Sequence, residues 1–256
     1  MLTGHLLEGI FTVNGLEQAS EKEKVEYLRS LRKSATLLWQ SFQKQNVFAD
    51  YSTKEIQECY LLRYFEPYAN FLLRELEELE KSYFQEKKSY TVSFFGVGPG
   101  SEIIALLHFL KTNTQINKIH INLFDKEPWA HSRKIISNYL IPKFWNPKDL
   151  TSNSYNVDFS SSSFWQFPEN RGELIIKSDL VIFQNCLNEI SDTELTQTNA
   201  NISGIFNHLS SNSLIVFIDQ AVGKYQSTSY MLDQIIQTAE DSPDIFIYGC
   251  FSVLIS

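Results

Sequence analysis

The chain has 256 residues and a mass of 29.6 kDa, which at about 150 residues per domain indicates one or two domains. Apolar residues make up 43% and charged residues 20%, which excludes disorder as a description of the whole chain. The formal net charge of −8 excludes a protein that holds nucleic acid through overall charge, although a local basic patch stays compatible with it.

The cysteine, histidine and apolar patterns bear on metal sites, disulfides and cellular location. Three widely separated cysteines, Cys59, Cys186 and Cys250, form no CxxC pair, so we expect neither a zinc ribbon nor a disulfide framework. The five histidines lack ligand spacing, and no metal site is predicted. The sequence shows no secretory leader and no run of 18 apolar residues, so we expect a cytoplasmic location without membrane attachment.

Residues 1–89 have helical patterns. Apolar side chains recur at spacings of three, four and seven over residues 21–45, which predicts one amphipathic helix. A second helix is expected from Ser52 onward, and Pro67 predicts a kink or a break within it. We therefore predict an N-terminal helical cap region over residues 1–89.

From residue 90 onward, strand and helix patterns alternate, which predicts an α/β domain over residues 90–256 with parallel pairing. Two last β segments, Ile245–Tyr248 and Phe251–Ile255, are separated by very little chain, which predicts a closing hairpin. The other expected strands are Thr91–Phe95, Ile119–Phe124, one ending near Val157–Asp158, Leu180–Phe183 and Leu214–Ile218; the expected helices are Ser101–Lys111, Pro128–Leu140, Thr193–Leu209 and Thr228–Glu240.

The segment from Phe94 to Glu102 reads FFGVGPGSE and places three glycines between an expected strand and an expected helix. Glycine permits a positive φ and leaves no Cβ in the way of a ligand, while N–H groups at a helix N-terminus face anions. The segment therefore predicts that Gly96, Gly98 and Gly100 bind a carboxylate or phosphate group. A tight strand-to-helix turn without a ligand is the alternative.

Acidic residues end the next two expected strands. Asp125 is suited to accept hydrogen bonds from both hydroxyls of a ribose, and its alternative role is to cap the following helix. Asp158 is suited to accept from an adenine amino group while Phe159 packs near the base. A surface turn explains Asp158 and Phe159 nearly as well.

The order of these motifs resembles the class I S-adenosylmethionine-dependent methyltransferases over roughly residues 90–256. Gly96–Gly100 is similar to the GxGxG loop of that family, Asp125 to its acidic residue after the second strand, and Asp158–Phe159 to its adenine-contacting motif. The resemblance implies S-adenosyl-L-methionine as cofactor and a Rossmann-like, seven-stranded, mostly parallel sheet with an antiparallel closing hairpin. Residues 187–189, Leu-Asn-Glu, are also weakly similar to ribosome- and RNA-associated methyltransferase-like proteins.

One position departs from the family pattern. Many members carry an acid two residues before the first glycine, where it contacts the amino group of the cofactor's methionine end, and here that residue is Phe94. Because related enzymes often lay an N-terminal helix over the cofactor, the resemblance points to Arg63 for the methionine carboxylate and to Tyr60 or Tyr64 for a hydrogen bond. The alternative is an aromatic stripe that faces the core, with an arginine that reaches solvent.

The loop after the fourth strand, 184–189, is where the resemblance places the methyl acceptor. Methyl transfer is an in-line displacement that needs a positioned nucleophile. Glu189 is the candidate general base, with helix capping as its alternative role. Asn185 or Asn188 is the candidate to orient the acceptor, and Asn185 has binding of the cofactor through its backbone as its alternative role. Cys186 as a nucleophile is less favoured, because isolated cysteines usually serve packing.

We therefore predict an S-adenosylmethionine-dependent methyltransferase whose acceptor is a small molecule, a protein or an RNA. Two alternatives stay open: a catalytically inactive interaction module, suggested by Phe94, and an NAD-dependent oxidoreductase, suggested by Gly96, Gly98 and Asp125. A partner protein bound through the N-terminal helices is a further expectation. Nucleic acid is not favoured, because residues 1–90 carry 12 basic and 14 acidic side chains and residues 91–256 carry 10 and 16.

Overall fold

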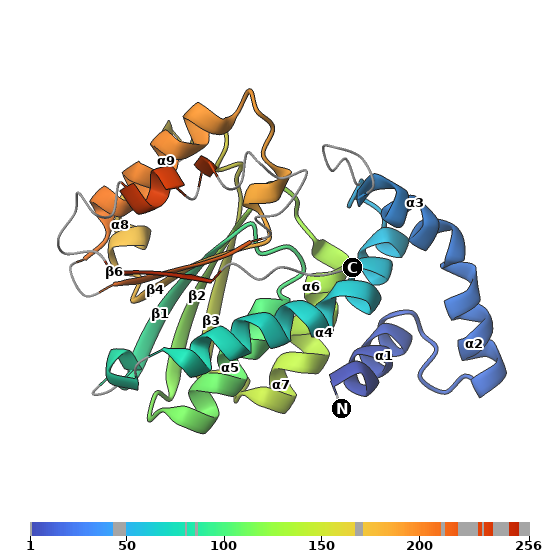
Figure 1. Ribbon diagram of the computed structural model, residues 1–256. Helices are drawn as coiled ribbons and strands as arrows, with labels where there is room; N and C mark the ends of the chain where they lie inside the picture. The colour runs from blue at the N-terminus through green and yellow to red at the C-terminus, as the bar shows by residue number, and fades with distance from the viewer. Residues whose placement is uncertain are drawn as a thin grey trace. The chain divides into compact units, whose positions relative to one another are not determined.

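A computed structural model describes residues 2–42, 50–79, 81–84, 87–166, 171–210, 213–219, 230–231, 233–237 and 246–250 (Figure 1). The α-helices are α1 (Leu2–Val13), α2 (Glu21–Ser30), α3 (Arg32–Phe42), α4 (Lys54–Glu78), α5 (Ser101–Asn113), α6 (Ala130–Ile135), α7 (Ile141–Phe144), α8 (Arg171–Ile176) and α9 (Leu195–His208). The strands are β1 (Ser89–Phe95), β2 (Lys118–Asp125), β3 (Leu150–Asn156), β4 (Leu180–Gln184), β5 (Leu214–Ile218) and β6 (Phe246–Cys250).

The chain divides into two compact units whose segments alternate along the sequence. One, here called the helical unit, comprises Met1–Gln85, Gly98–Gln115 and Glu127–Asp149. The other, the sheet unit, comprises Glu86–Val97, Ile116–Lys126 and Leu150–Ser256. Because these units consist of interleaved segments, they do not test the predicted boundary at residue 89, which stays a prediction.

The strands of the sheet unit form one sheet in the order β3-β2-β1-β4-β5-β6, and every described pairing is parallel. The predicted parallel α/β pattern is thus confirmed. The predicted seven strands and antiparallel hairpin are not seen: the described part of the sheet has six strands. Phe246–Cys250 pairs directly and in parallel with β5, and the second half of the predicted hairpin falls on residues 251–255, outside the described residues.

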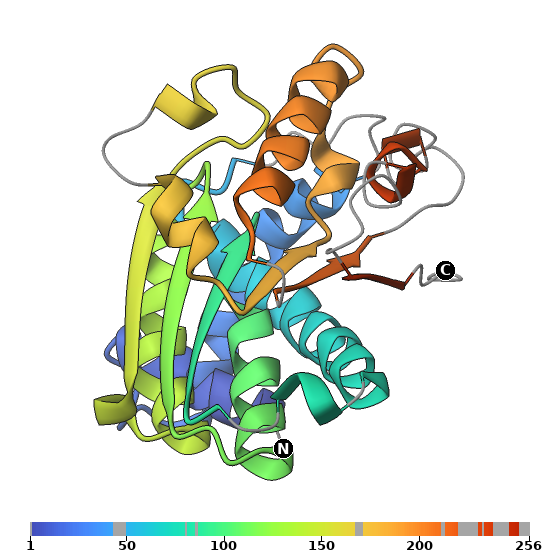
Figure 2. The same cartoon turned by 90° about the vertical axis from the view of Figure 1, so that its left-hand side faces the viewer.

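One row of aromatic side chains crosses the sheet. Neighbouring rings in this aromatic row have centroids 4.7–5.0 Å apart and planes within 17° of parallel. Strand register puts one ring on each of β3, β2, β1, β4 and β5: Tyr155, Phe124, Phe95, Phe183 and Phe217. Side chains of α8 and α9, such as Ile175, Ile202 and Phe206, belong to the same core cluster. These two helices therefore bury one face of the sheet (Figure 2).

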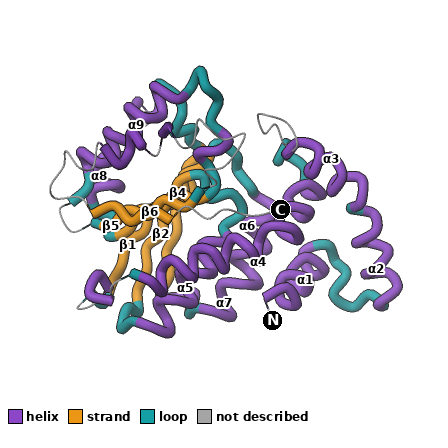
Figure 3. The backbone as a smooth tube through the Cα atoms, viewed as in Figure 1, coloured by secondary structure: helices purple, strands orange, loops and turns teal. Residues whose placement is uncertain are grey.

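The helical unit contains α1 to α7 (Figure 3). The single helix predicted over residues 21–45 is two helices, because the chain turns at Leu31, whose side chain is buried and whose N–H donates to the Arg29 carbonyl. The break predicted at Pro67 does not occur, since α4 is continuous through it. Pro67 and Arg63 are both exposed, so water can hydrogen-bond the Arg63 carbonyl that loses its helical donor.

The helix predicted over Pro128–Leu140 begins two residues later and contains a π-turn. α6 is followed by a π-helix over Ile136–Leu140 and then by α7. The N–H of Ile141 donates to the Ile136 carbonyl, five residues back. Pro142 follows Ile141 and has no N–H to continue the α-helical pattern, which gives the π-turn a local cause.

A buried carboxylate joins four segments of the helical unit. Glu58 on α4 has an exposed fraction of 0%. It accepts hydrogen bonds from Asn14 Nδ2 (2.6 Å) and Tyr27 Oη (2.6 Å), and its Oε1 lies 2.7 Å from His131 Nε2. A buried carboxylate is tolerated when it is paired and hydrogen-bonded in this way. The Glu58 cluster therefore ties α2, α4, α6 and the residue after α1 together.

Candidate functional site

The glycine loop follows β1, and its backbone has a positive φ at each of the three glycines. The φ angles of Gly96, Gly98 and Gly100 are 62°, 55° and 101°, a region that other residues seldom adopt. Within the sheet unit, a Cβ added to Gly96 would lie 2.3 Å from the Cβ of Cys186. Only glycine fits there, and the contact gives the buried Cys186 a packing role.

In the helical unit, the space around Gly98 is bordered by Trp129 and Arg133. A Cβ on Gly98 would stand 3.7 Å from the Trp129 ring, an ordinary contact distance. Arg133 Nε donates to the Gly98 carbonyl at 3.1 Å. Trp129 itself has φ 48° and precedes α6, a conformation of the kind that clusters at ligand sites. A side chain at Gly98 is therefore disfavoured by the backbone angle and not by a close neighbour.

Gly100 is the N-cap of α5, and Glu102 lies in the first turn of that helix with an exposed fraction of 4%. The first N–H groups of a helix attract negative charge. A buried carboxylate in the same turn also favours a positively charged group nearby. This end of α5 thus combines donors for an anion with an acid suited to an ammonium group.

Asp125 is the last residue of β2 and is 6% exposed. Phe95 and Phe124 are paired in the parallel register, and the Gly96 N–H donates to the Phe124 carbonyl at 2.8 Å. Asp125 therefore ends β2 at the level where Gly96 follows β1. This placement is the one that ribose recognition by a strand-end carboxylate requires.

Asp158 and Phe159 have well-defined local surroundings in the sheet unit. Asp158 Oδ1 accepts from the Ser160 N–H (2.9 Å) and hydroxyl (2.6 Å), which closes a turn after β3. The Phe159 ring is buried and meets the rings of Phe95 and Phe183 edge-on at 6.5 and 5.9 Å. Both residues thus have structural roles, and their predicted contacts with adenine stay predictions.

The loop after β4 contains strained backbone. Asn185 has φ 51°, its N–H donates to the Ile218 carbonyl at 2.8 Å, and its buried Nδ2 has no hydrogen-bond partner among the described residues. A left-handed non-glycine residue costs about 1–3 kcal/mol and persists where surrounding contacts hold it. Glu189 is half-buried, with Oε2 3.9 Å from Lys126 Nζ. An amide donor and a carboxylate therefore occupy this short loop.

Arg63 and Tyr64 lie on α4 in the helical unit, where Arg63 is exposed and Tyr64 is half-buried. The Tyr64 ring packs against three others, Phe42, Tyr60 and Tyr68, at centroid distances of 4.9–5.5 Å. This packing agrees with the aromatic stripe considered as the alternative for this helix. A cofactor role for either residue stays a prediction.

The sheet unit brings Gly96, Asp125, Asp158 and Asn185 to the carboxyl ends of β1 to β4, and Glu189 follows in the loop after β4. The helical unit contains Gly98 and Gly100, and it also holds three residues near them that the sequence did not single out: Glu102, Trp129 and Arg133. In the sequence, only its position directly after Pro128 could have drawn attention to Trp129. Among the described residues, no three His, Cys, Asp or Glu side chains gather in a way that would hold a metal ion.

No protein-family model matches the chain, and no curated protein matches it. Solved structures do show similarity. The reductase domain of PhqB from Penicillium fellutanum aligns at a TM-score of 0.42 and 10% identity over 73% of this chain, and this chain spans about half (53%) of that domain. The plantazolicin methyltransferase BpumL in complex with SAH aligns at a TM-score of 0.42 and 16% identity, covering 86% of this chain and 76% of BpumL.

The trans-methyltransferase CalH, also in complex with SAH, aligns at a TM-score of 0.39 and 10% identity, covering 86% of this chain and 60% of CalH. The weak similarity to RNA-associated proteins has no counterpart among these structures. No helix in the described part of the chain is both long and apolar enough to cross a bilayer. All three TM-scores are too low to argue an activity, which has to come from the residues themselves.

Proposed function

We propose that the protein binds S-adenosyl-L-methionine and transfers its methyl group to an acceptor. The observation that carries this proposal is the glycine loop after β1, with three glycines at positive φ and Asp125 at the end of the adjacent strand. Open parallel sheets bind nucleotide-like ligands at the carboxyl ends of their strands, where the strand order reverses. In this sheet the reversal lies between β1 and β4.

Each residue has a role in the proposal. Asp125 accepts from the ribose hydroxyls, Asp158 and Phe159 contact the adenine, and the N–H groups that begin α5 hold the carboxylate of the methionine end. Arg63 and Tyr64 are the further candidates for that carboxylate. Glu102 takes the place of the acid missing at Phe94 and pairs with the methionine ammonium group.

The cofactor supplies an electrophilic methyl group on a sulfonium. The loop after β4 positions the acceptor. Asn185, through its buried Nδ2, orients the acceptor atom in line with the methyl carbon. With the cofactor bound, its methyl group would pass from sulfur to the acceptor, and the electron pair of the carbon–sulfur bond would stay on sulfur. Glu189 removes a proton where the acceptor carries one.

One observation favours a second candidate, an NAD-dependent oxidoreductase. The order β3-β2-β1-β4-β5-β6 with parallel pairs throughout the described sheet is the order of dinucleotide-binding sheets. Against it, Ser101 stands where the GxGxxG loop has its third glycine. A third candidate is an interaction module, which the exposed Leu37 (52%) and Trp39 (57%) of α3 favour as a surface for a partner protein.

Ligand-dependent unfolding of cofactor-free protein tests the proposal. S-adenosylhomocysteine at 100 times its Kd should stabilise the protein by about 2.7 kcal/mol, a rise in Tm of roughly 5–10 °C for this chain length. Asp125→Asn should weaken binding by about tenfold or more, because a charge-assisted hydrogen bond is worth about 1.5–3 kcal/mol. Asp192→Asn, at an exposed loop residue of the same unit, is the matched control.

The outcomes separate the candidates. Stabilisation by S-adenosylhomocysteine that Asp125→Asn weakens and Asp192→Asn does not would support the methyltransferase. Stabilisation by NADH alone would support the oxidoreductase. No effect of either ligand would support the interaction module and overturn both enzyme candidates.

A further inference from the structure

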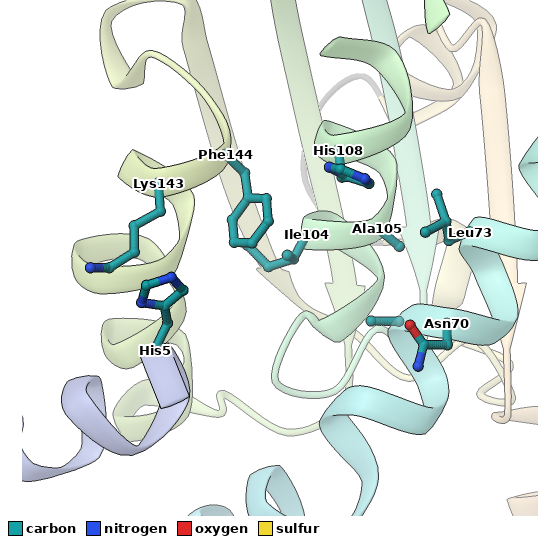
Figure 4. A pocket seen from close by; sticks show the side chains of 9 residues that line it. His5, Asn70, Leu73, Ile104, Ala105, His108, Lys143 and Phe144 are labelled. Atoms are coloured by element: carbon teal, nitrogen blue, oxygen red, sulfur yellow. The ribbon is translucent and has the colours of Figure 1, made fainter. Parts of the chain in front are cut away.

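A cavity of about 350 Å³ lies within the helical unit, lined by α1, α4, α5 and α7 (Figure 4). This volume is near the lower end of the range of about 300–1,000 Å³ for small-molecule pockets. It holds roughly a dozen water-sized groups. Ala105 and His108 on α5 lie five and eight residues after Gly100, so they stand roughly 7 and 12 Å along the helix axis from the glycine loop. Ile104, four residues after Gly100, is the lining residue of α5 nearest the loop, and none of the three glycines is among the described lining residues.

The floor of the cavity is apolar. Ile104 and Ala105 of α5 are 1% and 3% exposed, and both line the cavity. The Phe144 ring stands edge-on to the His108 ring at 6.1 Å. Figure 4 shows Ile104, Ala105 and Phe144 between Leu73 on one side and His5 on the other. An alkyl or aryl group is what such a floor buries favourably.

The polar residues that line the cavity include one lysine and no acid. Lys143 lines it together with His5, His108 and Asn70, and none of its described lining residues is acidic. Figure 4 places His5 and Lys143 together at one end. An anionic head group at that end meets a lysine and a histidine, whereas a cationic one is repelled.

Lys143 has donor capacity for a ligand. Its ammonium lies 3.2 Å from Glu8 Oε2, and His5 Nδ1 lies 3.6 Å from the same atom. Hydrogen bonds and charge from Lys143, with a smaller effect of His5, hold the pKa of Glu8 below its usual value. Glu8 is outside the cavity, with a side chain 60% exposed, and it uses one of the three donors of the ammonium. Figure 4 draws this ammonium at the outer end of the cavity, beyond the His5 ring, where its other donors face a carboxylate bound at that end.

From these observations we propose that the cavity binds a small carboxylate with an apolar body. The apolar part occupies the floor between α4 and α5, and the carboxylate lies at the end formed by His5 and Lys143. Alkyl and aryl acids share this chemistry, so the test includes one of each. The proposal does not depend on the proposed methyltransferase activity.

Isothermal titration calorimetry of the full chain with octanoate, 1-naphthoate and the neutral 1-octanol tests the proposal. Saturable binding of either acid supports it and identifies the shape of the apolar body that fits. Lys143→Gln should weaken binding of the acid by about three- to tenfold and leave 1-octanol unchanged. Lys134→Gln, at an exposed lysine of the same unit outside the cavity, should leave all three Kd values within twofold.

Ala105→Leu should abolish binding by filling the floor, and Leu73→Phe, at a half-buried lining residue of α4, serves if the first variant does not fold. Saturating S-adenosylhomocysteine should leave the octanoate Kd unchanged. Absence of saturable binding of either acid, binding that survives the filling variants, or displacement by S-adenosylhomocysteine would overturn the proposal. An equal effect of Lys143→Gln on octanoate and 1-octanol would overturn its anionic part.

Discussion

Replacing Glu58 by glutamine should lower the free energy of unfolding by about 3 kcal/mol. Removing one partner of a buried charged cluster costs about 3–5 kcal/mol, because the remaining polar groups lose their counterpart without regaining water. Glu58 itself is fully buried. The His131 side chain is 19% exposed, and Asn14 and Tyr27 are half-buried. These partners recover some hydration, so the lower end of that range applies.

Two further variants make the expected order specific. Tyr27→Phe removes a single donor to the carboxylate and should cost about 1–2 kcal/mol. Burial, and then the hydrogen bond to Glu58, raise the pKa of Tyr27, so this hydroxyl stays a donor at neutral pH. Glu77→Gln, at an exposed position on the same helix, should change stability by less than about 0.5 kcal/mol.

Urea unfolding, followed by circular dichroism, measures the three variants beside the wild-type protein. The midpoint should fall with an unchanged m-value, because the change acts on the native cluster and not on the surface exposed by unfolding. Equal midpoints for Glu58→Gln and Glu77→Gln would refute the reasoning, because the Glu58 carboxylate would then behave like the exposed carboxylate of Glu77. A changed m-value would show that the effect lies in the unfolded state.

Three further predictions concern the core, the glycine loop and alkaline pH. Phe183→Ala, in the middle of the aromatic row, should cost about 3–5 kcal/mol of stability in urea unfolding, and a loss below 1 kcal/mol would contradict the packing. Gly96→Ala should lower Tm more than Gly98→Ala, because both strain φ but only the Cβ at Gly96 meets Cys186 at 2.3 Å; equal losses would contradict the close contact. Burial raises the pKa of Cys59 to about 11 from an ordinary value near 9. The protonated thiol's contribution to the free energy of unfolding is therefore complete below pH 9. It is lost as pH rises to 11, by up to about 1.4 kcal/mol per pH unit. Cys59→Ala should flatten that decline in a pH series of urea midpoints, and an unchanged slope would exclude this thiol as its cause.

The strands were predictable because their signal is local. Short apolar runs bounded by polar or turn residues gave β5 as observed and β4 to within one residue. The turn at Leu31 carries no such signal: the apolar stripe continues through it without Gly or Pro. Only the burial of Leu31 in the helical unit distinguishes two helices from one. At the β6 edge of the sheet, the sequence predicted a closing hairpin. Its first segment forms β6, which pairs in parallel with β5, and its second segment falls on residues 251–255, outside the described residues.

The candidate site was predictable where it depends on residue type and not where it depends on packing. Three closely spaced glycines indicate unusual backbone, and their positive φ angles follow. Trp129 has a positive φ that nothing in its residue type favours, and Arg133 on α6 reaches the carbonyl of Gly98 in the loop before α5. Neither feature is encoded by spacing along the chain, because both arise from the packing of the helical unit.

The loop after β4, beside the point of strand reversal, is held to both neighbouring strands. The Asn185 N–H donates to the Ile218 carbonyl, and the Leu187 N–H donates to the Asp219 carboxylate at 2.7 Å, so two hydrogen bonds hold the loop after β4 to the end of β5. On the other side, Cys186 packs directly against Gly96. A left-handed Asn185 persists because these contacts over-determine its backbone. A loop fixed in this way presents its side chains without an entropic cost on binding, which a ligand site needs and a simple strand-to-helix turn does not.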